Sequence, residues 1–319
     1  MMNDKLNLTT IVKSITDDIK SRLDDFGMFY RIFSRGKTVS SIRHKLSIKG
    51  STYNESKKMQ DIIGVRVVLY FAEDVDIVYN YLKTLPNYLD ESNSSKEIKE
   101  LEANDSEFKK RIGLLYDKLF MPQRLNLIFR MSSQDTECLK MALAGFEGSS
   151  CIDNTFEVQI RTIFSEGWHE VEHDLRYKCL KDEMWDYCKE ESRMLNGIYA
   201  SLETTENSMK SMFDNMAYKN FKHNDWGAML RNKFCIRFED NKLSDSVLKL
   251  LSSKECLLGK EIFRYERSEL FPLFKRLPHR IPRTMDNIVF LLNRVTIQDE
   301  RITTLEPMPI ADLLNAINQ

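Results

Sequence analysis

Residues 155–163 of the chain have the sequence TFEVQIRTI, and the middle of this stretch alternates between apolar and polar side chains. The alternation predicts a half-buried β-strand, because successive side chains of a strand point to opposite faces of its sheet. One face would carry Phe156, Val158 and Ile160, and the other Glu157, Gln159 and Arg161. The polar face would present a carboxylate, an amide and a guanidinium side by side, which is a good place for chemistry.

Two further stretches predict strands. Residues 61–71, DIIGVRVVLYF, are dense in Ile and Val and too short for a typical buried helix, so we expect a buried strand there. Residues 125–131, LNLIFRM, are the other candidate. Apolar residues recur at helical spacing in residues 8–33 and 75–82, which predicts an amphipathic helix on either side of the 61–71 strand.

The composition indicates a soluble, cytoplasmic, helix-rich globular protein. The 319 residues carry 47 Lys and Arg against 48 Asp and Glu, which excludes a strongly basic chain that coats nucleic acid. Hydrophobic residues make up 42% of the chain and can build a core, and no apolar run approaches the ~20 residues of a membrane helix. The six cysteines form no CxxC pair, so we expect reduced thiols rather than a zinc site.

The patterns divide the chain near residue 220. Residues 164–219 are charged and helical in pattern, and the pattern starts again after His223 with short helical segments. We therefore expect one domain over residues 1–220 and a mostly helical accessory domain of unknown role over residues 221–319. Residues 90–111 are polar and of mixed charge, which is typical of a solvated insertion.

Basic and hydroxyl side chains precede and open a helix that we expect from Val39. In residues 35–45, RGKTVSSIRHK, Ser41 and Lys45 lie four apart on one helix face, with Arg35 and Lys37 just before the N-terminus. Backbone donors at a helix start, a hydroxyl and several cations suit a polyphosphate. An ordinary solvated basic helix start is the alternative.

Two carboxylates are candidate metal ligands. Asp61 opens the 61–71 strand, and a carboxylate at a sheet edge near a polyphosphate is a natural Mg²⁺ ligand. Glu157 could supply a second ligand or act as the base for an attacking hydroxyl. Taken alone, Asp61 is better explained as a residue that caps the start of the strand.

Four motifs stand in order along the chain. R-x-K-x-x-x-S-x-x-x-K matches residues 35–45, and D-[IV]-x-G-[IV]-R matches residues 61–66. E-V-Q-I-R-T matches residues 157–162, and W-x-x-x-E-H-x-x-x-Y-K matches residues 168–178. Together they resemble the (p)ppGpp synthetase domain of RelA/SpoT-type proteins, as in a divergent small alarmone synthetase. The resemblance covers residues of about 10–215.

This resemblance implies an α+β fold, with a mixed β-sheet flanked by helices and related to nucleotidyltransferases. It also implies an ATP-dependent pyrophosphokinase that transfers the β,γ-pyrophosphate of ATP to a 3′-hydroxyl, with Mg²⁺ as cofactor. Arg35, Lys37 and Lys45 would hold the ATP phosphates with Ser41 beside them, and Arg66 would belong to the same ATP site.

The resemblance also implies catalytic and acceptor residues. Asp61 would hold Mg²⁺, and Glu157 would share the metal site or draw the proton from the acceptor hydroxyl. The residues that would bind the acceptor are Arg124, Gln159, Arg161, His173 and Lys178.

One block of the family pattern is missing. Family members carry G-Y-[RQ]-S-[LI]-H ahead of the EVQIRT strand, and its tyrosine stacks on guanine. Residues 120–131, FMPQRLNLIFRM, have no tyrosine, serine or histidine in the matching places. Stacking is worth roughly 1–3 kcal/mol per base, so we expect GDP and GTP to be poor acceptors and adenine nucleotides or tRNA ends to do better. Rapid transfer to GDP or GTP would instead mean that Phe120 or Phe129 replaces the tyrosine.

Other interpretations remain open. The basic residues around two prolines in residues 275–283 could bind tRNA, as in toxin-like relatives that modify tRNA, or could form a solvated turn. The stretch HEVEH, residues 169–173, fits the H-E-x-x-H zinc motif but lies inside the fourth motif. The chain could also catalyse a different transfer from the same donor site, or be a non-catalytic nucleotide-binding module.

Overall fold

A computed structural model describes residues 7–49, 53, 57–93, 125–172, 188–253 and 255–318 of the chain. Its internal contacts divide the chain into two units. Unit 1 contains residues 1–20 and 30–206, and unit 2 contains residues 21–29 and 207–319. The second change of unit falls inside helix α8 (Lys189–Lys222), ahead of the boundary expected near residue 220. The domains 1–220 and 221–319 stay a prediction.

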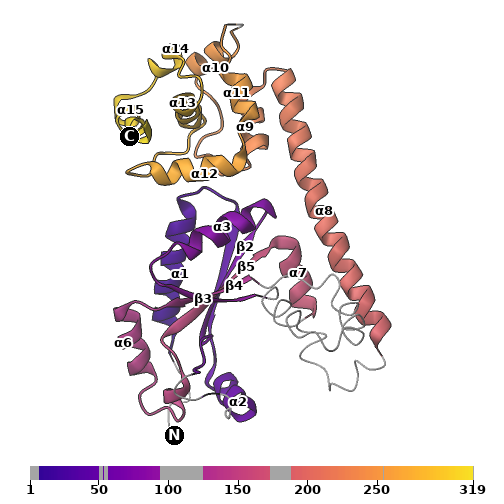
Figure 1. Ribbon diagram of the computed structural model, residues 1–319, viewed down its shortest axis with the longest axis vertical. Helices are drawn as coiled ribbons and strands as arrows, with labels where there is room; N and C mark the ends of the chain where they lie inside the picture. Colours follow the sequence, from indigo (N-terminus) through magenta and orange to yellow (C-terminus); the bar gives the residue numbers. More distant parts are fainter. Residues whose placement is uncertain are drawn as a thin grey trace, which may run out of the picture. The chain divides into compact units, whose positions relative to one another are not determined.

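Unit 1 is built on one five-stranded sheet (Figure 1). Its strands are β1 (Tyr30–Gly36), β2 (Ile63–Leu69), β3 (Tyr88–Asn93), β4 (Leu125–Arg130) and β5 (Thr155–Thr162). Their order in the sheet is β1-β2-β5-β4-β3. The pair β2 and β5 is parallel, and the other neighbouring pairs are antiparallel. The expected mixed sheet, and with it the α+β fold class, is confirmed.

Helices flank the sheet, with α1 and α3 on one side and α7 on the other (Figure 1). Among the described residues, the helices of unit 1 are α1 (Thr9–Asp24), whose last turn belongs to unit 2, α2 (Val39–Lys49), α3 (Glu73–Lys83), α6 (Ser133–Ala142), α7 (Ile163–Glu172) and the first part of α8. A 3-10 turn covers Ser149–Cys151. The apolar side chains of β5, Phe156, Val158 and Ile160, are buried as predicted, while its three polar side chains are partly exposed.

The helix predicted over residues 8–33 is too long. Helix α1 ends at Asp24, and Gly27 takes a left-handed backbone with φ 67°, which lets the chain turn into β1. Strand β3 covers the start of the polar segment 90–111, and the rest of that segment lies outside the described residues. Tertiary pairing along the sheet edge has therefore overridden the helical pattern in one case and the polar composition in the other.

The regular elements in the described part of unit 2 are all helices. Its helices are the remainder of α8, α9 (Trp226–Phe234), α10 (Asp245–Leu251), α11 (Leu258–Arg264), α12 (Arg267–Arg276), α13 (Met285–Val295), α14 (Glu300–Thr303) and α15 (Met308–Asn315), with a last 3-10 turn over Ala316–Asn318. Helix α13 is the central element, because most of its side chains are buried. None of the described helices is both long and apolar enough to cross a bilayer.

Two buried arginines hold the backbone of unit 2. Arg283 is 6% exposed, and its Nη1 donates to the carbonyl oxygen of Asp24 at 2.7 Å. Arg267 is 4% exposed, and its Nε donates to the carbonyl oxygen of Phe234 at 2.6 Å. The last carbonyls of a helix have no partner within the helix. The two guanidinium groups therefore satisfy the ends of α1 and α9.

Replacing Gly27 with Ala should destabilise unit 2. A left-handed backbone costs an ordinary residue about 1–2 kcal/mol, and a Cβ at this position would lie only 2.5 Å from Nε of Arg283. Arg283 would have to move and give up its carbonyl partners, so we expect a total loss above about 2 kcal/mol. Urea unfolding measures this loss.

Gly145→Ala is the matched control. Gly145 also has a positive φ, 77°, but no heavy atom lies within 4 Å of a Cβ built there. It should lose only the backbone contribution of about 1–2 kcal/mol. Equal losses in the two variants would contradict the role of Arg283.

Candidate active site

The polar face of the unit 1 sheet carries a cavity of about 500 Å³. Its walls come from the strands β1, β2 and β5 and from helix α7. Lys37, directly after β1, and Asp61, just ahead of β2, complete the lining. The lining residues are Phe33, Ser34, Arg35, Lys37, Asp61, Gly64, Val65, Arg66, Glu157, Gln159, Glu166 and Glu170. Residues from the first three sequence motifs therefore meet in one place.

Strand pairing explains this meeting. Arg35 on β1 is paired with Gly64 on β2, and Gly64 is paired with Glu157 on β5. Directly opposed residues of neighbouring strands lie on the same face of a sheet. Arg35 and Glu157 therefore flank Gly64, which has no side chain to separate them. Two residues further along β2, Arg66 is paired with Gln159 in the same way.

Two lysines surround one aspartate, Asp61, at one end of the cavity. Nζ of Lys37 forms an ion pair with the Asp61 carboxylate and donates to the Asp61 backbone carbonyl at 2.9 Å. Nζ of Lys45, on α2, lies 2.8 Å from each carboxylate oxygen of Asp61. The cluster therefore holds two positive charges and one negative charge.

Burial and ion pairing compete in this cluster. Burial alone would raise the pKa of Asp61, but the hydrogen bonds and charges of Lys37 and Lys45 outweigh it, and the pKa is lowered. Burial is the stronger effect on Lys37 and lowers its pKa. For Lys45, the contacts with Asp61 outweigh burial and raise the pKa. Asp61 is thus held ionised at neutral pH.

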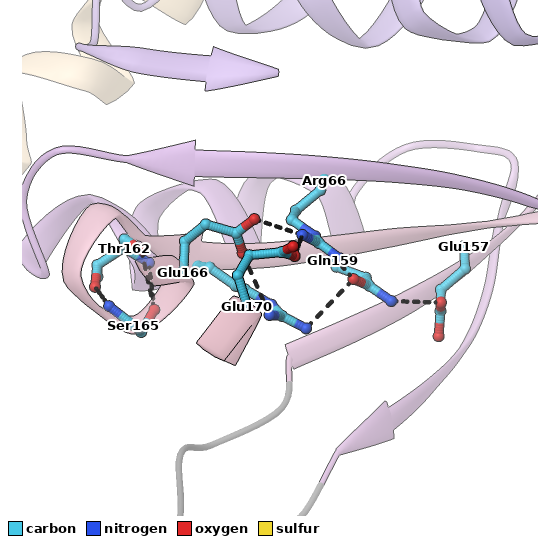
Figure 2. Close-up of polar contacts among 8 residues, drawn as sticks. Arg66, Glu157, Gln159, Thr162, Ser165, Glu166 and Glu170 are labelled. Atoms are coloured by element: carbon cyan, nitrogen blue, oxygen red, sulfur yellow. Dashed lines mark hydrogen bonds and ion pairs between the residues drawn. The ribbon is translucent and has the colours of Figure 1, made fainter. Parts of the chain in front are cut away.

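Arg66 is held against α7 by two glutamates (Figure 2). Its Nη1 forms ion pairs with the carboxylates of Glu166 and Glu170, and its Nε donates to Oε1 of Gln159 at 3.3 Å. Gln159 in turn donates from Nε2 to Glu157 at 2.8 Å. Burial alone would lower the pKa of Arg66, but the two glutamates outweigh it and raise the pKa. This chain of contacts orients the Glu157 carboxylate.

The start of α7 fixes the two glutamates relative to the sheet. The backbone N–H of Ser165 donates to Oγ1 of Thr162 at 3.2 Å, and the backbone N–H of Thr162 donates to Oγ of Ser165 at 2.9 Å (Figure 2). This is a reciprocal cap of the kind found at helix starts. Glu166 and Glu170 are four residues apart, so they lie on one face of the helix.

Asp61 and Glu157 fit a magnesium ion that is shared with a substrate. Mg²⁺ is usually bound by one or two carboxylates together with water and substrate phosphates. Both carboxylates line the cavity, and the Asp61 side chain is 30% exposed to solvent. Within the described part of the chain, no group of three or more acidic, His or Cys side chains could hold a metal ion. The donor set therefore suits an ion that arrives with phosphates.

The other predicted site residues lie beside the cavity or outside the described chain. Ser41 is exposed on α2, and its hydroxyl lies 2.9 Å from that of Thr38. Arg161 has a side chain 12% exposed and donates to Glu166 at 3.3 Å, so it supports α7. Three predicted site residues, Arg124, His173 and Lys178, lie outside the described ranges, and their roles stay predictions.

Four residues that line the cavity were not predicted from the sequence: Phe33, Ser34, Glu166 and Glu170. Glu166 and Glu170 follow the EVQIRT motif, and an acidic pair at helical spacing is the signal that could have identified them. Phe33 was hidden because residues 8–33 were expected to form one helix. It lies on β1 with a side chain 52% exposed.

Phe129 does not replace the missing tyrosine. Its side chain is 0% exposed, and its ring is stacked on that of Phe156 with 5.4 Å between the centroids. It belongs to the core on the apolar face of the sheet. Phe120, the other aromatic considered, lies outside the described residues.

Some residues of the basic run 275–283 and of the HEVEH stretch form contacts within the protein instead of the tRNA or zinc contacts considered for them. Arg283 is buried on backbone carbonyls, and Arg280 pairs with Glu239 at 3.1 Å. Glu170, the glutamate of the zinc-motif interpretation, forms its ion pair with Arg66. The second histidine of that motif, His173, lies outside the described residues.

Residues 34–182 match the family model described as a region found in RelA / SpoT proteins. The matched segment contains the four sequence motifs and the residues of β2, β4, β5 and α7. The chain therefore carries a RelA/SpoT-type region, and the resemblance is confirmed. A search of curated proteins found no match to the chain.

Several solved structures are similar to the chain. Small alarmone synthetase 1 from Bacillus subtilis is 19% identical, with a TM-score of 0.42 over 64% of this chain and 93% of its own. Small alarmone synthetase 2 from the same organism is 19% identical, with a TM-score of 0.39 over 64% and 92%. A GTP pyrophosphokinase family protein from Streptococcus pneumoniae is 18% identical, with a TM-score of 0.40 over 63% and 88%.

Asp61→Asn should lower the stability of unit 1 at neutral pH but not in acid. The substitution leaves Lys37 and Lys45 without their shared carboxylate, so we expect a loss of about 1–2 kcal/mol at pH 7. Because the folded-state pKa of Asp61 lies below its ordinary value of 3.8, its contribution is present above that value. The contribution disappears as the pH falls through the lower, folded-state pKa.

Urea unfolding of both proteins between pH 7 and pH 3 measures the difference. Asp17→Asn, at an exposed position of α1, is the control and should change stability little at any pH. A difference between wild type and Asp61→Asn that does not shrink in acid would contradict the ion-pair assignment.

Proposed function

We propose that the chain is an ATP-dependent pyrophosphokinase that transfers the β,γ-pyrophosphate of ATP to the 3′-hydroxyl of a nucleotide acceptor. The observation that carries the proposal is the joining of Lys37, Asp61 and Glu157, from three separate family motifs, in one cavity. The protein would then be an alarmone synthetase that acts in a stringent response. Because the donor is ATP, we place the reaction in the cytoplasm.

The donor half of the proposed site is the end with Lys37, Lys45 and Asp61. The two ammonium groups would neutralise charge on the triphosphate, and Arg35 offers a planar group that can bind two phosphate oxygens. Asp61 and Glu157 would hold Mg²⁺, which neutralises further charge on the phosphates when bound. Each ammonium group already contacts the Asp61 carboxylate, so phosphate binding would exchange this partner rather than expose a bare charge.

The transfer would be a displacement at the β-phosphorus. The acceptor 3′-oxygen forms a bond to this phosphorus, while the bond to the oxygen that bridges the α- and β-phosphorus breaks and AMP leaves with the electron pair. Glu157, whose carboxylate accepts a hydrogen bond from Gln159 at 2.8 Å, would either share the metal or take the hydroxyl proton. Positioning and charge neutralisation supply most of the catalysis in such reactions.

The acceptor remains open among guanine nucleotides, adenine nucleotides and the 3′ end of tRNA. A toxin-like enzyme acting on tRNA would need cations beyond the cavity, and two arginines of the 275–283 run are engaged within unit 2. We therefore favour a free nucleotide. A non-catalytic nucleotide-binding module is the remaining alternative, and the presence of both Asp61 and Glu157 in the cavity argues against it.

Asp61→Asn should abolish Mg²⁺-dependent release of AMP from ATP. The amide has nearly the same shape but lacks the charge that a divalent cation requires, so we expect a loss of at least about a hundredfold. The measurement is AMP release across a panel of acceptors, with Asp17→Asn as the matched control that keeps wild-type activity. Equal release by wild type and Asp61→Asn would rule out the metal assignment.

GDP and GTP should be poorer acceptors than adenine nucleotides. The described part of the cavity lining contains no tyrosine, and Phe129 is buried in the core. The ring that does line the cavity, Phe33, comes from β1 rather than from the matching place ahead of β5, and stacking on it would not select guanine. The test is transfer from ATP labelled at the β- or γ-phosphate to GDP, GTP, ADP, ATP and bulk tRNA side by side. Rapid labelling of GDP or GTP alone would overturn this expectation. Label in tRNA would favour the toxin-like alternative.

A further inference from the structure

Phe33 is an exposed aromatic ring in the cavity wall, and no motif or step of the proposed reaction uses it. Its side chain is 52% exposed and lines the cavity. Tyr30 and Ile32 lie on β1 at positions of the opposite face, and Tyr30 is 6% exposed. Phe33 therefore lies on the polar face of the strand, between Arg31 and Arg35.

Phe33 lies on the same strand as Arg35, a short distance from the Lys37, Lys45 and Asp61 cluster that is the proposed phosphate site. Phe33 precedes Arg35 by two residues, which is about 7 Å along a strand, and Lys37 follows directly after the strand. The cavity thus runs from the lysines around Asp61, past Arg35, to the ring. A nucleotide whose phosphates bind the lysines has its ribose and base extending away from them, which is the direction of Phe33.

The ring is open to a ligand. Phe33 is paired with Arg66 on β2, a guanidinium that could have covered it. Arg66 instead forms its ion pairs with Glu166 and Glu170 on α7. Among the described residues, no other ring and no cation lies against Phe33. Single exposed apolar residues are common on proteins, but this one stands in a polar cavity beside phosphate-binding cations.

We propose that Phe33 is the stacking platform for a nucleobase bound in this cavity. The inference rests on the proposed function, since it takes the lysine cluster as the phosphate site. Every base has a π-face that can stack on an aromatic ring, so Phe33 can hold a purine without reading its edge. The base could belong to the ATP donor or to the acceptor, and the two sources share this chemistry.

Binding measurements on Phe33→Leu test the proposal without any need for turnover. Leucine keeps an apolar side chain on the strand but removes the aromatic face. Calorimetry with ATP, GDP and inorganic tripolyphosphate, each with Mg²⁺, compares ligands with and without a base. We expect about tenfold weaker binding of the base-bearing ligand and unchanged binding of tripolyphosphate. Phe33→Tyr should restore wild-type affinity.

The ligand that loses affinity identifies the source of the base. A loss confined to ATP assigns Phe33 to the donor, and a loss confined to GDP assigns it to the acceptor. Unchanged affinity for both nucleotides overturns the proposal, as does an equal loss for tripolyphosphate, which has no base. Met141→Ala, at a 69% exposed position of α6 outside the cavity lining, should change no affinity.

This outcome is separable from that of the proposed function. A wild-type protein that binds ATP but transfers nothing would contradict the pyrophosphokinase, while a selective loss in Phe33→Leu would still support the stacking platform. An active enzyme whose Phe33→Leu variant binds every nucleotide normally would support the pyrophosphokinase and contradict the stacking platform.

Discussion

The parallel pairing of β2 with β5 is the contact on which the rest of unit 1 depends. It sets Gly64 against Glu157 and Arg66 against Gln159, so residues from motifs far apart in the sequence share one face of the sheet. The same register buries the apolar side chains of β5 on the other face. A slip of one residue would exchange the two faces and remove both the core and the cavity.

The polar face remains stable because its charges are compensated in place. Asp61 neutralises part of the charge of two lysines, and Arg66 is bound by two glutamates of α7. Partly buried charges without partners would be costly. This compensation also makes the cavity asymmetric, with ammonium groups around Asp61 at one end and carboxylates facing Arg66 at the other. A polyphosphate suits the first end, whereas a neutral ribose or base suits the second.

Local patterns predicted what depends on local chemistry. The alternation in residues 155–163 and the Ile and Val run in residues 61–71 identified β5 and β2. The motifs singled out Lys37, Asp61 and Glu157, and all three line the cavity. The patterns could not identify β1, because its pairing with β2 is a tertiary contact and its sequence continues the helical spacing of α1. The contact between α7 and Arg66 was likewise invisible, since it depends on where a helix packs.

The proposed nucleotide site lacks the family's tyrosine and has the exposed ring of Phe33 in its wall. A stacking surface contributes through its π-face alone, so it can be supplied from any wall that the base reaches. Phosphate and metal groups have no such freedom, because their charge and geometry must match fixed partners. The chain keeps Lys37, Lys45, Asp61 and Glu157, where the chemistry is constrained. It departs from the family pattern at the tyrosine, where the proposed stacking on Phe33 would offer a base a flat surface on another wall without selecting guanine.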